Sequence, residues 1–420
     1  MTGKFLNKFF VLSFLLVLLI ADTFTQDKNG GSVYTIYGLG DLDYSSSTRA
    51  DGMGITGLSL HGNYNNTMNP AAWTKIQYTI FSTTFTFQGF KSSDGVNTSS
   101  RVYADFEGFN LSVPINSPNG WILGLGLNKF SIVNYDIQTR GSSLGEGFTQ
   151  YYRGNGGLNR FSAGLSYLLF RYISFGIQFN YAFGDIKKTN QIDFDNTAIF
   201  DTHNSITNTI TGYYFNTGLI FNGFGKLFRS SKLDNLNLGL YFSTPAKFNS
   251  SITGTFEKVS KTDSVNVTEG KLDIPYTFGA GISNEINNRL IIAADFIYQN
   301  WDNYKYYGSH PSEIKNSYKA ALGIEFTESK KPEAEFFKKI SLRLGASYTA
   351  DYIRVNGNNI VSYGFSLGFG FPISTFNRID IAFNYIRKGK TSNGLIKEDI
   401  FKIGASVNVG ELWFLKPKDY

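Results

Sequence analysis

Long segments in which large apolar residues alternate with small or polar ones limit most strongly how this chain folds. Successive residues of a β-strand point to opposite faces of a sheet, so such a segment has one large apolar face and one small face. In residues 173–184 the large face carries Ile173, Phe175, Ile177, Phe179, Tyr181 and Phe183, and the other carries Ser174, Gly176, Gln178, Asn180, Ala182 and Gly184. Residues 360–372 repeat the pattern, which predicts a protein built from β-strands.

A secreted β-sandwich or propeller would also show alternation, with its large face in a water-free core. Two features favour a membrane instead. The small faces carry Gly, Ser, Asn and Thr, whereas the exposed face of a soluble sheet usually carries Lys and Glu. The segments are also longer than ordinary strands and long enough to cross a bilayer at a tilt.

Fourteen such segments predict an all-β fold, a transmembrane antiparallel β-barrel of about 14 strands. They are residues 78–90, 101–115, 120–134, 158–170, 172–186, 207–222, 234–258, 273–284, 288–299, 316–327, 339–352, 360–372, 377–387 and 399–414. An even strand number is what single-chain bacterial barrels require. The seventh segment contains Pro245, which we interpret as a bulge or bend within one strand.

The connections between these segments alternate in length. Those after odd-numbered strands average about twice the length of those after even-numbered strands. Since barrels have long extracellular loops and short periplasmic turns, both ends of the barrel sequence are expected on the periplasmic side. The turns at 223–233 and 328–338 are longer than this rule predicts.

The chain begins with the features of an export signal. Lys4 and Lys8 precede an apolar run at residues 9–20, which has signal-peptide length and is too short to span a bilayer comfortably. We therefore expect residues 1–26 to be removed and residues 78–420 to form the barrel. No later apolar run reaches the roughly 18 residues of a transmembrane helix. The expected location is the outer membrane of a Gram-negative bacterium.

The composition argues against several other functions. Without cysteine the chain carries no disulfide, thiolate site or lipid anchor. Its 39 basic and 33 acidic residues give a net charge of +6 without a basic block, so nucleic-acid binding has no support. The three histidines, His61, His203 and His310, form no Ser-His-Asp or metal-ligand pattern. We expect no enzymatic activity, no cofactor and no metal site.

Residues 27–77 lie outside the predicted strands and are rich in Gly, Asn and Ser. A barrel of this strand number is too wide for its own side chains to fill, so its lumen holds water or a plug. We predict that this segment is a hatch inside the barrel; the alternative is a flexible periplasmic tail. Its apolar residues are the candidates for lining a ligand pocket: Ile36, Leu39, Met53, Ile55, Leu58 and Leu60.

The motif "GLGDL…ADGMGITG…NPAAW" and the later "LDIPYTFGAGISNEINNRLIIAADFIYQNWDNYK" resemble the FadL-type outer-membrane transporters of long-chain fatty acids and aromatic hydrocarbons. The resemblance covers nearly all of the mature chain. It implies that Asn69, Pro70 and Ala71 form a structural hinge between hatch and barrel. In that family a kink in the third strand opens the wall sideways, which makes Gly124 and Gly126 candidates for a lateral-opening bend.

A few charged residues fall on inward positions of the predicted strands. They are Asp105, Glu107, Lys319, Glu325 and Arg343. One interpretation is a set of ion pairs that ties the hatch to the wall. The other is an anchor for a carboxylate ligand, with Arg343 or Lys319 as its partner.

The sequence thus favours a monomeric outer-membrane channel for passive uptake of hydrophobic small molecules, either fatty-acid-like or aromatic, gated by the hatch. Its expected partners are that substrate, outer-membrane lipid and lipopolysaccharide, and the barrel-assembly machinery. Two alternatives remain: a non-enzymatic secretion or assembly factor of the same superfamily, and a porin for polar solutes.

Overall fold

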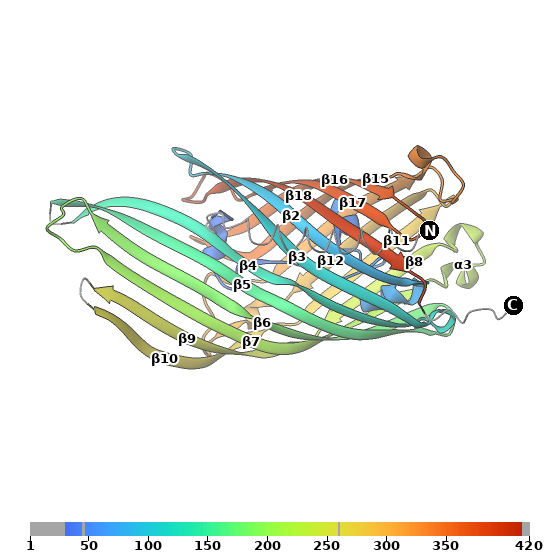
Figure 1. Ribbon diagram of the computed structural model, residues 1–420, viewed down its shortest axis with the longest axis horizontal. Coiled ribbons are helices and arrows are strands. Elements are labelled where there is room, and N and C mark those ends of the chain that lie inside the picture. The colour runs from blue at the N-terminus through green and yellow to red at the C-terminus, as the bar shows by residue number, and fades with distance from the viewer. Residues whose placement is uncertain (1–29, 44–46, 144, 259–260, 414–420) are drawn as a thin grey trace, which may run out of the picture.

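The strands close into one barrel around an N-terminal segment. The computed structural model describes residues 30–43, 47–143, 145–258 and 261–413, so the predicted signal peptide lies outside the described residues. The first and last strands of the wall, β2 (Thr79–Ser93) and β18 (Lys397–Glu411), pair antiparallel and close the barrel. Figure 1 shows the tilted strands of the wall with the blue N-terminal segment between them. The predicted all-β barrel is confirmed.

The remaining strands differ greatly in length. In chain order they are β3 (Thr98–Asn116), β4 (Trp121–Ser143), β5 (Glu146–Leu169), β6 (Ile173–Phe194), β7 (Thr202–Phe221), β8 (Leu236–Ser243), β9 (Ala246–Lys258), β10 (Lys261–Ile274), β11 (Thr277–Ile286), β12 (Leu290–Gln299), β14 (Ser317–Thr327), β15 (Ser341–Val355), β16 (Asn358–Pro372) and β17 (Arg378–Lys388). Two short strands lie apart from these: β1 (Asp41–Leu42) in the N-terminal segment and β13 (Lys305–Tyr306) in a loop. The connections include the short helices η3 (Ser117–Asn119), α3 (Phe224–Leu227), η4 (Ser231–Leu233), η5 (Trp301–Asn303) and η6 (Phe336–Lys339).

Two crossings of the wall are interrupted at prolines, and the wall as a whole has 14 crossings. β8 and β9 form one crossing, since both pair with β7, and Thr244 and Pro245 separate them. β10 and β11 form the next crossing and are separated by Pro275 and Tyr276. Proline supplies no N–H to a ladder, which explains why the two interruptions coincide with these residues. The prediction that Pro245 lies at a bend within one crossing is confirmed.

One part of the wall extends well beyond the rest. β4, β5, β6, β7, β9 and β10 run past the other strands at the end opposite the short turns (Figure 1). The predicted strands leave residues 135–157, 187–206 and 259–272 as extracellular loops. Their assignment as loops is wrong, because most of these residues continue the strands. Their sequences are polar on both faces, so they lack the alternation that signals a half-buried strand, while the backbone ladder forms without it.

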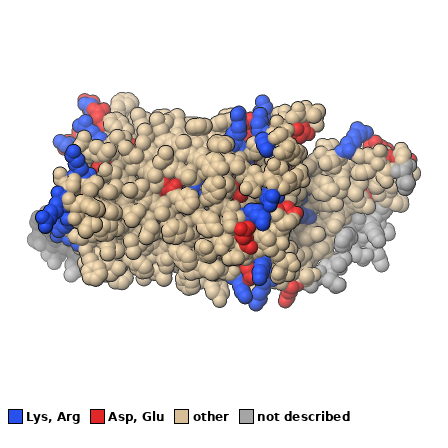
Figure 2. All heavy atoms as spheres, turned by 180° about the vertical axis from the view of Figure 1, so that it is seen from behind, with Lys and Arg blue, Asp and Glu red and all other residues tan. Residues whose placement is uncertain are grey.

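The outer face of the barrel is apolar over a broad belt. Phe87, Phe179 and Leu344 are examples of outward side chains that the protein itself leaves exposed. Figure 2 shows charged residues at one end of the barrel and in a band across it, with a nearly charge-free belt between them. Such a belt is expected to face lipid. Among the described residues, no helix is long and apolar enough to cross a membrane.

Residues 30–43 and 47–77, hereafter the hatch, run through the lumen. They contain η1 (Val33–Ile36), β1, α2 (Thr48–Gly52) and η2 (Pro70–Lys75). The small inward residues of the wall allow the hatch backbone to approach closely. A Cβ atom at Gly345 would lie 1.8 Å from the carbonyl oxygen of Met53, and one at Gly176 would lie 2.4 Å from the carbonyl carbon of Pro70. Close packing of the hatch therefore explains why these inward positions are glycine.

Candidate functional site

An apolar pocket of about 400 Å³ lies between the hatch and the wall, toward the outer end of the lumen. Its apolar lining comes from the hatch, from β6, β7 and β9, and from the loop between β12 and β14: Ile36, Tyr37, Leu39, Ile186, Ile206, Ile210, Ile252, Tyr304, Tyr306, Pro311 and Ile314. The pocket adjoins the largest apolar cluster of the protein, which includes Leu39, Ile186 and Ile210. It is a place where an apolar molecule would contact the hatch and the wall at once.

Few polar groups border this pocket. Lys188 on β6 donates a hydrogen bond from Nζ to the carbonyl oxygen of Ile36, at 2.8 Å. This bond holds the hatch against β6 at the edge of the pocket. Asn208 and Glu313 complete the polar part of the lining. The pocket therefore combines an apolar interior with charged groups on two sides, an arrangement typical of small-molecule sites.

Two adjoining cavities elsewhere in the lumen are polar instead. Their volumes are about 250 and 210 Å³, and Asp43, Lys319 and Lys402 border both. The Nζ atom of Lys402 lies 3.5 Å from a carboxylate oxygen of Asp51 and 3.5 Å from one of Glu107. Desolvation inside the lumen, with the Glu107 carboxylate nearby, raises the pKa of Asp43 to about 7. These cavities suit water and ions better than an apolar solute, because charged groups lose hydration next to one.

Buried ion pairs join the hatch to the wall. Arg49 of α2 donates from Nε and Nη2 to the two carboxylate oxygens of Glu325 on β14, at 2.8 and 2.7 Å. Arg343 on β15 donates from Nε to Glu325 at 2.7 Å, and its Nη1 lies 2.8 Å from Asp380 on β17. Arg343 is fully buried by these contacts. Glu325 thus joins Arg49 of the hatch to Arg343 of the wall, an arrangement that fits the first of the two interpretations given above.

A second tether uses a single wall carboxylate. Asp295 on β12 accepts hydrogen bonds at one oxygen from three backbone N–H groups, those of Thr56, Gly57 and Leu58, at 3.0, 2.6 and 3.2 Å. The hydroxyl of Thr56 donates to the same oxygen at 2.9 Å. Hydrogen bonds to an ionised acceptor are stronger than neutral ones. Asp295 thus fixes the turn that follows α2.

The beginning of the hatch is tied to the wall in the same way. Lys388 on β17 pairs with Asp41 of the hatch at 2.7 Å and with Asp351 of β15 at 2.8 Å. Glu398 on β18 accepts hydrogen bonds from the hydroxyl of Ser32 and from the N–H of Val33, at 2.6 and 2.8 Å. Charged contacts therefore hold the hatch along the whole side formed by β12 and β14–β18.

The Asn-Pro-Ala motif precedes the first barrel strand in sequence, and its hydrogen bonds join it to the hatch at Leu58 and to β8 at Leu240. The side chain of Asn69 donates to the carbonyl oxygen of Leu58 at 2.6 Å and accepts from the N–H of Ala71 at 3.0 Å, which caps η2. Pro70 occupies the first helical position, where a missing N–H costs nothing. Asn69 and Ala71 are completely buried. These contacts fit the structural role that the resemblance implied for this motif.

β3 and β4 separate toward the outer end of the wall. Their pairing runs from Asn116 opposite Trp121 to Gly108 opposite Asn128 and stops there, although both strands continue. The hatch covers part of the edge of β4 that is left free. β1 pairs with residues 131–132 of β4, and the N–H of Gly30 donates to the side chain of Asn134 at 2.7 Å.

The hatch also passes between the two separated edges. A Cβ atom at Gly30 would lie 3.7 Å from Cβ of Arg101 on β3, and one at Gly31 would lie 3.0 Å from Cβ of Asn134 on β4. Arg101 reaches across to Asp136, with 3.2 Å between Nη1 and the carboxylate. The start of the hatch and this ion pair together fill the split between β3 and β4.

The two glycines that the sequence suggested as a bend lie below the split. Gly124 and Gly126 belong to the part of β4 that is paired on both sides. A Cβ atom at Gly124 would lie 2.6 Å from the ring of Trp73, so this glycine makes room for the hatch. The irregularity of β4 is instead the register shift between Lys129 and Ser131.

The predicted ligand-binding residues separate into two groups. Ile36 and Leu39 line the apolar pocket. Met53, Ile55, Leu58 and Leu60 are buried where the hatch packs against the wall, and Ile55 also borders one polar cavity.

Sequence reasoning missed most of the wall residues of the pocket. Lys188 and Ile206 fall in a segment predicted as a loop, and Ile252 lies in a long strand that gave no hint of a cavity. The available signal was that Ile206 and Ile210 lie four residues apart, and therefore on the same face of a strand. No group of three or more His, Asp or Glu that could hold a metal ion occurs among the described residues.

Solved structures share this fold, a 14-crossing barrel with an N-terminal segment tied into its lumen. The monoaromatic hydrocarbon channel CymD matches with a TM-score of 0.57 and 15% identity over 90% of this chain and 99% of its own. A Pseudomonas aeruginosa FadL homologue matches with a TM-score of 0.57 and 13% identity over 88% and 99%. The Pseudomonas putida toluene transporter TodX matches with a TM-score of 0.54 and 16% identity over 89% and 99%.

The family itself is given by a match to the family model named BamG, which extends over residues 6–419. The chain therefore belongs to the BamG family. No curated protein matches it. With this fold and family, the chain is a protein of the outer membrane of a Gram-negative bacterium.

Proposed function

We propose that the chain is a passive channel for hydrophobic small molecules, fatty-acid-like or aromatic, and that the hatch gates it. The apolar pocket of about 400 Å³ between the hatch and β6, β7 and β9 carries this proposal. A ligand bound there touches Ile36 and Leu39 directly, so its arrival is coupled to the position of the hatch. The structural neighbours CymD, a monoaromatic hydrocarbon channel, and TodX, a toluene transporter, support the same solute class.

The part of the hatch that moves in this proposal is residues 30–43, and its movement breaks the contacts of this segment with Glu398 and Lys388. This segment borders the pocket through Ile36 and Leu39 and fills the split between β3 and β4. A shift of the segment would connect the two, so that a solute leaves sideways into the bilayer. The larger of the two polar cavities adjoins the same split, since Gly31 and Asn134 line it, and an apolar solute enters that cavity only at a cost.

Blocking the pocket tests the proposal. Ile206 points into the mouth of the pocket, and Ile206→Trp is expected to lower uptake of a fatty acid or of toluene on the order of tenfold, because a filled pocket excludes the solute. Tyr213→Trp on the lipid-facing side of the same strand is the matched control. Equal uptake by the Ile206→Trp variant and the wild type would remove the pocket from the pathway.

A second function, participation in the assembly of other outer-membrane proteins, is favoured by the family name BamG. Under this function the barrel is a fixed component, and the tethers keep its hatch closed. Stable co-purification with the barrel-assembly machinery, together with no uptake of hydrophobic solutes, would support it. A lipid-like molecule recovered from the pocket would support transport instead.

The third possibility, a porin for polar solutes, makes a distinct prediction. If the protein were such a porin, the entry of sugars through it would swell liposomes that contain it. The hatch and its buried ion pairs lie across the path that a sugar would take, so we expect no swelling.

A further inference from the structure

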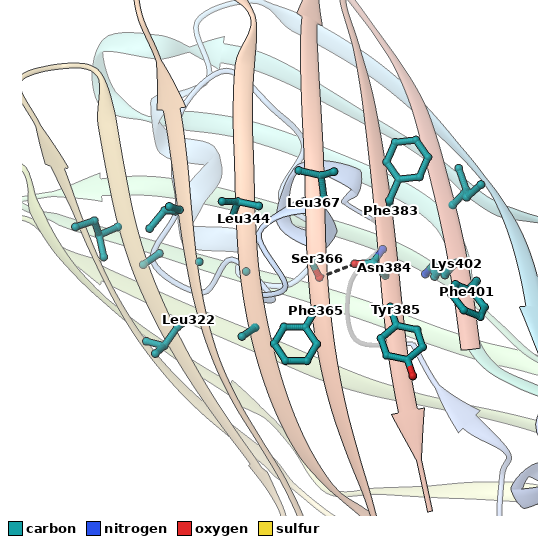
Figure 3. A pocket seen from close by; sticks show the side chains of 17 residues that line it. Leu322, Leu344, Phe365, Ser366, Leu367, Phe383, Asn384, Tyr385, Phe401 and Lys402 are labelled. Atoms are coloured by element: carbon teal, nitrogen blue, oxygen red, sulfur yellow. Dashed lines mark hydrogen bonds between the residues drawn. The ribbon is translucent and has the colours of Figure 1, made fainter. Parts of the chain in front are cut away.

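The outer wall carries an apolar groove that the transport proposal does not use. Its volume is about 900 Å³, and it lies on the lipid-facing side of β14–β18. The side chains that form it come from neighbouring strands in two rows, as Figure 3 shows: Leu344, Leu367 and Phe383 in one row, and Leu322, Phe365, Tyr385 and Phe401 in the other. The hydrogen bond between Ser366 and Asn384 belongs to the opposite, inward face.

Strand register explains the hollow. Leu322, Ala346, Phe365, Tyr385 and Phe401 lie directly opposite one another across five strands. Ala346 is the small member of this row, and bulky neighbours on both sides rise above it. Leu322, Phe365 and Phe401 are more than half exposed in the protein alone. The groove is therefore open along the membrane and apolar along its length.

A charged row crosses the same strands one step closer to the extracellular end. Tyr348, Tyr363, Arg387, Asp399 and Lys91 lie opposite one another on β15, β16, β17, β18 and β2. Arg387 donates to Asp399 at 2.9 Å, and Tyr385 of the groove donates to the same carboxylate at 2.6 Å. Lys397 lies 3.6 Å from Asp399. Arg387 and Lys397 thus contact the Asp399 carboxylate, and Lys91 lies opposite Asp399 in the strand register. Three cations with one anion leave an excess of positive charge above the groove.

We infer that this surface binds a phosphorylated glycolipid of the outer leaflet, of the lipid A type. An acyl chain lies in the groove over Ala346, and a phosphate meets Arg387 and Lys91. The position fits the outer leaflet, because the row lies at the end of the strands that carries the long extensions. A neutral or cationic headgroup would leave the excess positive charge unmatched.

The headgroup is expected to supply the selectivity. An acyl chain gains no hydrophobic energy by moving from the bilayer into the groove, since both are equally apolar. Cationic side chains near the membrane surface, in contrast, attract anionic headgroups, and an Arg guanidinium can bind a phosphate through two hydrogen bonds. The groove then orients the acyl chain, and the cationic side chains give the selectivity for an anionic headgroup.

The test measures binding of lipid A to the purified full-length protein in detergent by native mass spectrometry. A double variant, Arg387→Gln with Lys91→Gln, is expected to bind lipid A about tenfold more weakly than the wild type. The matched control replaces two exposed lysines on the opposite wall, Lys247→Gln with Lys271→Gln, and is expected to bind as the wild type does. Lipid A without phosphates is expected to bind the wild type as weakly as phosphorylated lipid A binds the double variant.

A variant that leaves every charge in place tests the groove separately. Ala346→Trp fills the hollow and is expected to weaken binding, whereas Ala280→Trp, on a lipid-facing position outside the groove, is not. Heat-modifiable migration on gels confirms that each barrel is folded. The inference is overturned if the double variant binds lipid A as well as the wild type does, or if phosphate-free lipid A binds equally well. Equal losses in the variants and their controls would also overturn it.

Discussion

The hatch is held in different ways on the two sides of the lumen. On the side of β12 and β14–β18 its contacts are charged and buried, such as Arg49 with Glu325 and the turn at Thr56 with Asp295. On the side of β6, β7 and β9 it packs through apolar side chains and encloses a pocket. Charged hydrogen bonds demand one geometry, whereas apolar contacts tolerate several. The hatch from α2 to Leu58, which has the charged contacts with Glu325 and Asp295, is therefore expected to stay fixed. Residues 30–43, which border the apolar pocket, are expected to yield to a ligand.

The largest expected effect comes from breaking the charged side at Arg49. Arg49→Ala removes two hydrogen bonds from Glu325, and loss of one partner of a buried pair costs about 3 to 5 kcal/mol. The α2 amides should then exchange faster, by the factor that corresponds to this loss of free energy. Arg140→Ala is the contrast, because its pair with Asp195 is exposed and worth about 1 kcal/mol or less. Unchanged exchange in α2 would mean that this ion pair does not hold the hatch.

A smaller effect is expected at Asp295. Asp295→Asn keeps the shape of the side chain and removes the charge that three N–H groups share. Hydrogen bonds to a charged group contribute about 1.5 to 3 kcal/mol, so the amides of Gly57 and Leu58 should exchange faster by one to two orders of magnitude. Asp185→Asn, the same exchange at an exposed residue of β6 that pairs with Thr209, serves as the control. If the amides of the turn exchange at the same rate in both variants, Asp295 lies next to the hatch without holding it.

On the apolar side, Lys188 provides the sharpest local probe. Lys188→Met leaves the carbonyl oxygen of Ile36 without its donor at the edge of the pocket, which costs about 1 to 2 kcal/mol. Exchange should rise in residues 36–39 and stay constant in α2. A rise that spreads to α2 would contradict the division of the hatch into a fixed and a yielding part.

The smallest effect concerns pH. The pKa of Asp43 is raised to about 7 in the folded protein and lies near its ordinary value when the chain is unfolded. The folded state therefore binds the proton more tightly, so stability is greatest in acid and falls as pH rises to about 7. Between about pH 6 and about pH 8 the loss is about 1 kcal/mol. Asp43→Asn should abolish this dependence in thermal unfolding, and an unchanged slope would show that another group titrates.

Much of the barrel could be predicted from the sequence because lipid imposes a strict rule on it. Every crossing needs large outward residues, and this alternation gave all 14 crossings and the bend at Pro245. The extensions beyond residue 134 were missed because water wets both of their faces, so no alternation arises. Lipid imposes no such rule on the exposed turns, so their order along the chain could be predicted but their conformation could not.

The site was harder to predict than the fold. Ile36 and Leu39 could be predicted as pocket residues, because apolar side chains of a segment inside a barrel either pack against the wall or line a cavity. Which hatch residues pack and which leave a cavity depends on how the segment meets each wall strand. Met53 and Leu58 pack against glycines of the wall and leave no space. Ile36 faces isoleucines of the wall, whose larger side chains keep the hatch backbone farther from the strands and leave the pocket. Strand spacing alone does not contain that information.

The central claim is that residues 30–43 move while α2 stays in place, and two engineered disulfides test it most directly. The chain has no cysteine of its own. Gly30→Cys with Arg101→Cys fastens the start of the hatch to β3, where the two Cβ atoms would be 3.7 Å apart, a suitable separation for a disulfide. Thr48→Cys with Gly404→Cys fastens α2 to β18 on the charged side.

Uptake of a hydrophobic solute is then measured for each protein before and after reduction. We expect the 30–101 disulfide to block uptake until it is reduced, and the 48–404 disulfide to leave uptake close to that of the wild type. Uptake that continues through the oxidised 30–101 protein, or that stops only with the 48–404 disulfide, would contradict the account.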